Sequence, residues 1–432
     1  MLLSADWVLP VDGPPIRNGA VALDDARIAA VGPAGELGEG ERFEGAAIIP
    51  GFVNAHSHLE YAVYAGFGDG LPFGPWILDH TERKRRIGWD EMLAIARLGA
   101  AQCLRSGITT VADASFCGAS ARACADLGLR ALVYLEVFGR GTEQIVDRFG
   151  INRARIENAL SERVRLGISP HAPYTCSPEL YAACAALDLP IATHLAESEA
   201  EQEWLRSGTG AWEHLAELLP PPTGQTGIRT LAAHALLSAA MVAVHCVKVD
   251  AEEIALLAKH DVAVAHCPRS NALLGCGVAP FTDLRRAGLR VGLGTDSPAS
   301  TPSFDMFDEL RAAVMAARAR EERSDALSAT EALELATLGS AAALGLGGEV
   351  GSLTPGKRSD LAVVSLDGSP YFPWEDPAAA VVFGGSPERV LLTVVDGHEC
   401  YRKGGTEWHE LTAAASSARR QLLQTAATKV PT

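Results

Sequence analysis

Short apolar segments alternate with longer amphipathic segments through the middle of the chain, from Gly51 to about Gly347. The apolar segments predict eight strands that are buried on both faces, and the segments between them carry apolar residues at helical spacing. Residues 90–107 are one such helix, which a glycine ends. This alternation is typical of parallel strands covered by helices. The predicted strands are residues 48–55, 107–115, 130–139, 163–171, 190–197, 241–246, 261–268 and 289–297.

Eight strand-helix units within about 300 residues predict a closed (β/α)8 TIM barrel, which makes the fold α/β and places a catalytic domain at residues 51–349. A doubly wound open sheet is the alternative. Such a sheet normally carries a glycine-rich phosphate loop after an early strand, and the sequence contains neither G-x-G-x-x-G nor a Walker motif.

The two ends of the chain show a different pattern. Residues 1–50 and 350–432 contain short alternating strands that Gly and Pro interrupt, so we expect both ends to form one small, discontinuous β-sandwich domain beside the barrel. In the C-terminal part, residues 360–366, 379–385 and 389–397 are predicted strands, and residues 407–425 are a predicted helix.

Composition narrows the class of protein. Of the 432 residues, 48% are apolar, enough for a large core, and 37 basic against 53 acidic residues give a net charge of −16. This balance argues against nucleic acid as a partner. The N-terminus has no basic segment before its apolar stretch and no apolar run is long enough to cross a bilayer, so we expect a cytoplasmic protein without membrane contact. Nine scattered cysteines without a C-x-x-C pair indicate reduced thiols.

Residues that can bind metal or move protons stand at the C-terminal ends of most predicted strands. Active sites of (β/α)8 barrels form at that face, so these side chains are expected to converge. A single buried His is more often structural, and this reading is applied to His80, His214, His234, His260, His398 and His409. The strand-end residues are His56, His58, Asp113, Glu136, His171, His194, His245, His266 and Asp296.

His56 and His58 flank Ser57, and the two-residue period of a strand places both rings on one side, where two neutral imidazoles can bind one ion. The string PGFVNAHSH around them resembles the first-strand motif of the amidohydrolase superfamily. THLAE at 193–197, VHC at 244–246, HCPRSN at 266–271, GLGTD at 292–296 and LTPGKRSDLAV at 353–363 resemble the same family in the same order, with Ser359 where alanine is more usual.

The pattern is most similar to the mononuclear deaminase and chlorohydrolase branch, because the fourth strand ends in His171 and not in a lysine. The resemblance implies one divalent ion held by His56, His58, His194 and Asp296. Three nitrogens and one carboxylate suit catalytic zinc, and iron(II) would use the same ligands. We therefore expect a hydrolase that activates water.

Three residues are the predicted catalytic groups. Asp296 can accept the proton of water, and His245 can hold the nucleophile by a hydrogen bond. Glu197 lies three residues after His194, so in a first helical turn its carboxyl would lean over the metal and could protonate a ring nitrogen of the substrate. The alternative for Glu197 is an exposed acid at a helix start, which is the interpretation for Glu199, Glu201 and Glu203.

The HSHLEY and PHAPYTCS strings resemble deaminases of adenosine-type nucleosides. The resemblance favours 6-aminodeoxyfutalosine, of menaquinone biosynthesis, over methylthioadenosine and S-adenosylhomocysteine as the substrate. Expected substrate contacts are His171, Trp76, which could pack on a ring, and Arg140, which could bind a carboxylate. The basic run 83–86 is a weaker candidate for the same carboxylate contact and is interpreted as a solvated helix face.

Other readings stay open. A triazine or pterin amino- or chlorohydrolase would activate water in the same way, and a non-catalytic barrel scaffold would be expected to lack a ligand, although none of the four is missing. Asn271 and Ser297 are expected to orient the ligands. Relatives in this family commonly assemble, so a homodimer or larger homo-oligomer is possible.

Overall fold

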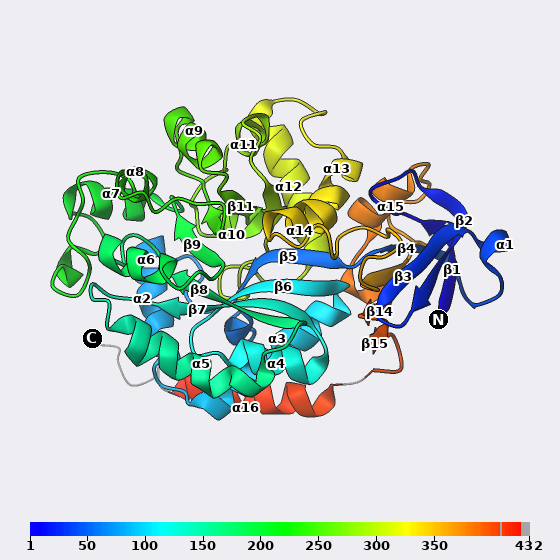
Figure 1. Ribbon diagram of the computed structural model, residues 1–432, viewed down its shortest axis with the longest axis horizontal. Helices are drawn as coiled ribbons and strands as arrows, with labels where there is room; N and C mark the ends of the chain where they lie inside the picture. Colours follow the sequence, from blue (N-terminus) through cyan, green and yellow to red (C-terminus); the bar gives the residue numbers. More distant parts are fainter. Residues whose placement is uncertain (407, 425–432) are drawn as a thin grey trace.

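Eight parallel strands form a barrel, in the order in which they occur along the chain (Figure 1). The structure is a computed structural model that describes residues 1–406 and 408–424. Each strand coincides with one of the eight predicted segments to within a few residues. The barrel strands are β5 (Phe52–Ser57), β6 (Ile108–Ser115), β7 (Arg130–Val137), β8 (Val164–Pro170), β9 (Ile191–Leu195), β10 (Met241–His245), β11 (Ala263–His266) and β12 (Val291–Leu293).

The first and last strands meet and nearly close the barrel. The side-chain amide of Asn54 donates to Thr295 Oγ1 at 2.7 Å, and its oxygen accepts the backbone N–H of Thr295 at 2.9 Å. One residue further, the N–H of Asp296 donates to the carbonyl of His56 at 3.0 Å. The predicted TIM barrel is confirmed, and its closure brings a strand-1 histidine beside the strand-8 aspartate.

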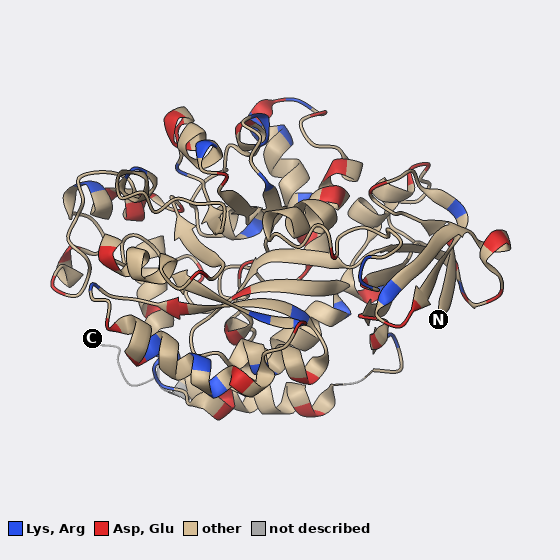
Figure 2. Cartoon of the chain, viewed as in Figure 1, with Lys and Arg blue, Asp and Glu red and all other residues tan. Residues whose placement is uncertain are grey.

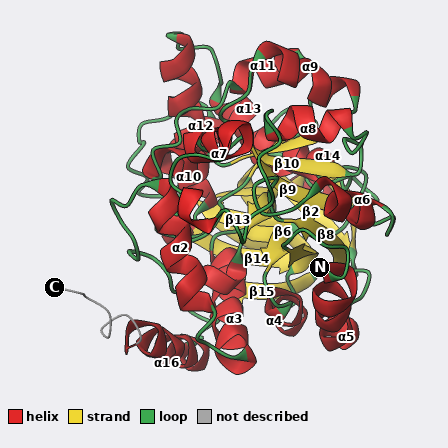
Figure 3. Ribbon diagram, turned by 90° about the vertical axis from the view of Figure 1, so that its left-hand side faces the viewer, coloured by secondary structure: helices red, strands yellow, loops and turns green. Residues whose placement is uncertain are grey.

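Helices surround the barrel strands (Figure 3). β6 and β7 are buried at every position, because one side of each strand faces the barrel interior and the other faces helices. The helix predicted at 90–107 is α3. The helices of this layer and its loops are α2 (Phe73–Lys84), α3 (Trp89–Arg105), α4 (Ala119–Leu127), α5 (Ile151–Ile156), α6 (Pro178–Ala185), α7 (Glu199–Ser207), α8 (Gly227–Ala233), α9 (Ala251–Lys259), α10 (Pro268–Leu273), α11 (Phe281–Arg286), α12 (Met306–Glu321), α13 (Ala329–Glu334) and α14 (Ser340–Ala343).

Strands from both ends of the chain form a second sheet at the right of Figure 1, in the order β15-β14-β13-β4-β1-β2-β3. β4 joins the two ends, because it pairs with β1 on one side and with β13 on the other. Seven strands and one short helix make up this region: β1 (Leu2–Val8), β2 (Ile16–Asp24), β3 (Arg27–Pro33), α1 (Ala34–Leu37), β4 (Glu41–Pro50), β13 (Leu361–Ser365), β14 (Val390–Val395) and β15 (His398–Arg402).

One predicted C-terminal strand is wrong. Residues 379–385 belong to the helix α15 (Pro377–Gly384), in which seven of the eight residues are buried. Asp376 starts this helix, since its carboxylate accepts the N–H of Ala378, and Pro377 fits the first helical turn. A helix that is apolar all round has no 3.6-residue pattern, so its sequence resembles a buried strand.

The predicted C-terminal helix is α16 (His409–Gln424), which packs against α3. Glu407 and Thr425, the ends of the predicted range, lie outside the described residues. Within the described part of the chain, no helix combines the length and the apolarity needed to span a membrane.

A buried ion cluster joins the barrel to the second sheet. Arg130, at the start of β7, donates from Nε to Asp360 at 2.8 Å and from Nη2 to Asp396. Arg163 donates to the other oxygen of Asp396 at 2.9 Å. Elsewhere, acidic and basic residues are interspersed along the outer helices in the view of Figure 2. All nine cysteines are free thiols, as predicted.

Candidate active site

A cavity of about 500 Å³ opens at the C-terminal ends of the barrel strands. This volume lies within the range of small-molecule sites, about 300 to 1,000 Å³. Arg140 and His56 are not among the residues that line the cavity. Seven of the predicted site residues do line it: His58, Trp76, His171, His194, Glu197, His245 and Asp296.

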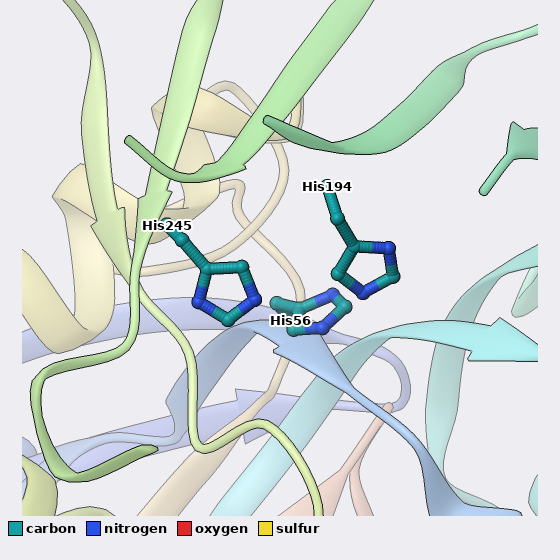
Figure 4. A group of neighbouring side chains, drawn as sticks. All are labelled: His56, His194 and His245. Atoms are coloured by element: carbon teal, nitrogen blue, oxygen red, sulfur yellow. The ribbon is translucent and has the colours of Figure 1, made fainter. Parts of the chain in front are cut away.

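The imidazoles of His56, His194 and His245 point toward one another from β5, β9 and β10 (Figure 4). The ring centroids of His56 and His58 are 4.8 Å apart, and those of His56 and His194 are 5.0 Å apart. Ligand atoms of His56, His194 and His245 lie within 4.8 Å of one another, as do those of His56, His58 and Asp296. Strand-end residues that are far apart in the sequence therefore converge, as the barrel topology predicts.

Hydrogen bonds fix the tautomers of two of these rings. Nδ1 of His58 lies 2.9 Å from the carbonyl of Ala114, and Nδ1 of His194 lies 2.8 Å from the carbonyl of His171. A carbonyl only accepts, so each Nδ1 carries the proton and each Nε2 presents a lone pair. The two Nε2 atoms are 3.3 Å apart, where neutral rings cannot bond each other.

This arrangement fits a metal ion. Two facing lone pairs are stabilised by a cation between them, and Nε2 of His56 is also buried without a hydrogen-bond partner among the described residues. Burial lowers the pKa of His56, and burial with the neighbouring His171 and His56 lowers that of His194 well below its ordinary value. The rings are therefore neutral at physiological pH, the form that binds a metal.

Asp296 completes the cluster through one oxygen. Its Oδ2 accepts hydrogen bonds from Ser270 Oγ at 2.6 Å and Ser300 Oγ at 3.0 Å, which leaves Oδ1 facing His56 Nε2 at 3.7 Å and His58 Nε2 at 3.6 Å. Burial alone raises the pKa of Asp296, but its contact with His56 and the other nearby imidazoles lower it well below the usual range. The two serines were not predicted. Their side chains orient the carboxylate.

Glu197 reaches the cluster from the loop after β9, because α7 begins only at Glu199 and not at Glu197 as predicted. Ala196 has a left-handed φ of 53° that turns the chain back over the barrel mouth. Glu197 Oε1 then lies 3.5 Å from His245 Nε2. Burial and the charge of Asp296 raise the pKa of Glu197 well above its usual value, which favours the protonated form of this carboxyl.

His245 is held by Asn271, whose Oδ1 lies 3.0 Å from His245 Nδ1. This contact places the proton on Nδ1 and directs the Nε2 lone pair toward Glu197. Burial lowers the pKa of His245 to about 3. Asn271 thus contacts a predicted catalytic residue and not one of the four predicted ligands, and Ser297 lies in the cavity wall.

Glu201 differs from its predicted place as an exposed acid of α7. Its side chain is fully buried, and its two oxygens accept the N–H groups of Ala196 at 2.9 Å and Glu197 at 2.8 Å. Glu201 therefore holds the turn that carries Glu197. Glu199 and Glu203 are exposed, as predicted.

Two of the three predicted substrate contacts line the cavity. His171 lies next to Phe138, with ring centroids 4.9 Å apart, and its Nδ1 is 2.8 Å from Thr175 Oγ1. Trp76 is 9% exposed and packs on His80, with ring centroids 4.5 Å apart. Both rings are therefore placed to contact a bound molecule.

Arg140, the third predicted contact, holds a loop instead. Its guanidinium donates to the carbonyls of Ala216 at 2.9 Å, Glu217 at 3.0 Å and Leu219. Residues 215, 218 and 219 of this loop line the cavity. The structure thus gives Arg140 a role in positioning the cavity rim, and the carboxylate contact predicted for it has no support here.

Other cavity residues were read differently from the sequence. Lys84 was predicted in a solvated helix face but is buried. His80 was predicted to be a structural histidine and is 3% exposed. Both side chains line the cavity. Glu136 also lines it, as its strand-end position suggested. Asp113 accepts bonds from Ser57 Oγ and the N–H of Leu59, and His266 packs on Phe281; neither lines the cavity.

Comparisons with known proteins agree with this geometry. The family model described as the amidohydrolase family matches residues 47–400. A 5′-deoxyadenosine deaminase of Methanothermobacter thermautotrophicus is 34% identical over 422 residues, covering 94% of each chain. A 5-methylthioadenosine/S-adenosylhomocysteine deaminase of Moorella thermoacetica is 32% identical over 418 residues, again covering 94% of each chain.

Solved structures share the whole fold. An adenosine deaminase of Xanthomonas campestris with bound zinc is 27% identical with a TM-score of 0.86, covering 98% of each chain. The zinc complex of an atrazine chlorohydrolase of Arthrobacter aurescens is 25% identical with a TM-score of 0.83, covering 98% of this chain and 99% of the other.

Proposed function

We propose that this chain, which belongs to the amidohydrolase family, is a metal-dependent hydrolytic deaminase of adenosine-type nucleosides with a modified 5′ position. The observation that carries the proposal is the contact of Glu197 with His245. In this contact a buried carboxyl lies 3.5 Å from an imidazole, beside a cluster of side chains that could hold a metal ion. The nucleoside deaminases among the relatives support the substrate class.

In this proposal His56, His58, His194 and Asp296 would hold one divalent ion, with zinc as the first choice and iron(II) as the alternative. When bound, the ion lowers the pKa of water and so provides hydroxide at neutral pH. Asp296 accepts the proton of water, while Ser270 and Ser300 hold its carboxylate in place through Oδ2. His245 Nε2 holds the nucleophile by accepting its O–H.

Glu197 supplies the proton that an aminopurine needs. Water adds at the ring carbon that bears the amine as one of its protons passes to Asp296, and Glu197 protonates the adjacent ring nitrogen. The amine then takes the proton from Asp296 and leaves as ammonia, and the remaining hydroxyl proton returns to Glu197 as the carbonyl forms. The products are ammonia and the corresponding hypoxanthine nucleoside. Burial keeps the proton on Glu197 until the substrate takes it, which suits a general acid.

The 5′ substituent of the substrate would contact the part of the cavity that lies beyond the base-binding site. The preference for 6-aminodeoxyfutalosine included a carboxylate contact with Arg140, and Arg140 is bound to three loop carbonyls. Without that contact, we place 5′-deoxyadenosine, methylthioadenosine and S-adenosylhomocysteine first and 6-aminodeoxyfutalosine fourth.

Ammonia release by the zinc-loaded protein tests the proposal. The panel is adenosine, the four 5′-modified nucleosides, a pterin and a chlorinated triazine. We expect the highest kcat/KM with a 5′-modified adenosine. Turnover of the triazine or pterin without any nucleoside would show that the substrate class is wrong, and metal binding without turnover of any compound would favour a non-catalytic scaffold.

A further inference from the structure

The cavity wall contains three buried or half-buried charged residues that the deamination chemistry does not use. They are Lys84 from α2, Glu136 from β7 and Arg148 from the segment after β7. A buried charge destabilises the protein unless it has partners. A charged group that lacks partners within the protein is therefore free to bind a ligand.

Two of the three charges are satisfied within the protein. Lys84 Nζ lies 4.2 Å from the ring centroid of Phe116, 5.4 Å from that of Phe138 and 5.5 Å from that of Tyr61, a set of aromatic faces that stabilises an ammonium. Arg148 donates to the carbonyls of Glu136 and Phe116, each at 2.8 Å, and its guanidinium also lies over Phe116 and Phe138.

Glu136 is the exception. Its side chain is buried, and its carboxylate makes no hydrogen bond to any described residue and no ion pair within 4.0 Å among residues 1–406 and 408–424. Burial alone raises the pKa of Glu136, but neighbouring charges, first that of Lys84, outweigh it and lower the pKa. The group is therefore an ionised carboxylate with only acceptor sites, which needs donors.

Another buried carboxylate shows how this fold satisfies a structural acid. Glu60 accepts hydrogen bonds from Ser115 Oγ at 2.6 Å and from the N–H groups of Phe116 at 2.7 Å and Ala119 at 2.9 Å. Glu136 has no such donors among the described residues and lines the cavity instead. The missing donors must come from the bound molecule or from water that it displaces.

We propose that Glu136 is a specificity-determining residue whose carboxylate accepts hydrogen bonds from the ribose hydroxyls of the substrate. This inference rests on the proposed nucleoside deaminase function. Glu136 lines the same cavity as His58 and His171, which places the carboxylate beside the reacting centre, where the sugar of a bound nucleoside would follow its base. Two vicinal hydroxyls provide two donors for one carboxylate, whereas an anionic substituent there would be repelled.

The test compares kcat/KM for adenosine, 2′-deoxyadenosine and 3′-deoxyadenosine in the zinc-loaded wild type, Glu136→Gln and the control Glu143→Gln. Glu143 is exposed in the loop after β7 and does not line the cavity. A hydrogen bond to a charged group corresponds to about 10- to 100-fold in binding, so we expect wild type and Glu143→Gln to prefer the ribonucleoside by that factor over at least one deoxy analogue. In Glu136→Gln the preference should fall to about threefold or less.

Each preference is a ratio on one preparation, so a partly folded variant does not distort it. If Glu136→Gln does not fold, the wild-type ratio and that of Glu136→Asp, which keeps the charge on a shorter side chain, decide the question. An equal kcat/KM for all three nucleosides in wild type, or an undiminished preference in Glu136→Gln, would overturn the proposal. Selective loss of S-adenosylhomocysteine turnover with the ribose preference intact would also overturn it, because Glu136 would then bind an ammonium.

The outcomes separate this inference from the proposed function. If wild type deaminates the three nucleosides without discrimination, Glu136 has been misassigned while the deaminase function stands. If no aminopurine nucleoside releases ammonia, the deaminase function fails and the ribose contact falls with it.

Discussion

Replacement of Glu201 by glutamine tests whether the catalytic acid depends on a buried carboxylate behind it. The two oxygens of Glu201 accept the N–H groups of Ala196 and Glu197. Glutamine is isosteric but has one acceptor and one donor, so in either orientation of its amide one N–H of the turn faces another donor.

The size of the effect follows from that unsatisfied group. A buried polar group without a partner costs about 1 to 3 kcal/mol, and Ala196 adds the cost of its left-handed backbone, about 1 to 2 kcal/mol, which the turn must offset. If the cost of the unpaired polar group destabilises the conformation that holds Glu197 over the cavity, the population of this conformation drops about 5- to 150-fold. We expect kcat/KM to fall by that factor while the metal content is unchanged.

The pH profile gives a second measurement. Burial raises the pKa of Glu201 to about 7, although its two backbone hydrogen bonds oppose the shift. Only the ionised form can accept both N–H groups, so wild-type kcat/KM should decrease as the pH falls through about 7. The amide in Glu201→Gln cannot ionise, so the acid limb that belongs to this group should be absent from the variant.

The assay is steady-state ammonia release from about pH 5 to about pH 9, a range that brackets the titration of this group, with metal analysis of every preparation. Glu199→Gln is the matched control, since Glu199 is exposed two residues earlier in the same helix. Activity of Glu201→Gln within twofold of Glu199→Gln would refute the reasoning. Loss of metal together with activity would show that Glu201 supports the ligands and not the acid.

Further variants probe other parts of the molecule. Glu197→Gln should keep the metal and lose about 10²- to 10⁴-fold in kcat, and a loss of only a few-fold would reduce Glu197 to a turn residue. Elemental analysis should find about one tightly bound ion per chain, with metal and activity lost together in His58→Ala; two retained ions that are both required would contradict a mononuclear site. Arg140→Ala should raise KM several-fold and speed proteolysis within residues 209–225, and unchanged proteolysis would exclude a bracing role. Asp360→Ala should destabilise the fold by about 3 to 5 kcal/mol, because it removes a buried ion-pair partner of the Arg130 guanidinium. The measurement is a lower Tm, and an unchanged Tm would refute this prediction.

The barrel could be predicted because its signals are local. Each parallel strand is buried on both sides and is a short apolar run, and each intervening helix shows its own period, so eight units could be counted without any knowledge of contacts. The same rule produced the error at α15. That helix is apolar on every side, and only Asp376 and Pro377 before it mark a helix start.

The metal-binding cluster could be predicted for a topological reason. All parallel strands of a barrel end at one face, so His56, His194, His245 and Asp296 had to meet once the strands were placed. The groups that orient them could not be found this way. Ser270 bonds Asp296 from a neighbouring helix, and no spacing in the sequence shows which hydroxyl points at which carboxylate.

The position of Lys84 in the cavity could have been predicted from the sequence. Within the basic run 83–86 it looks like one solvated charge among four, yet Trp76, His80 and Lys84 follow one another at intervals of four residues on α2. Side chains at this spacing share one helix face, and Trp76 was already expected to face the substrate. The four-residue spacing therefore assigns Lys84 to the cavity and its charged neighbours to other faces of the helix. The structure agrees, because Arg83 pairs with Asp79 and Arg86 pairs with Glu82. The charge of this lysine lowers the pKa of Glu136, which lines the same cavity and, among the described strand-end carboxylates, is the one left without hydrogen-bond donors of its own.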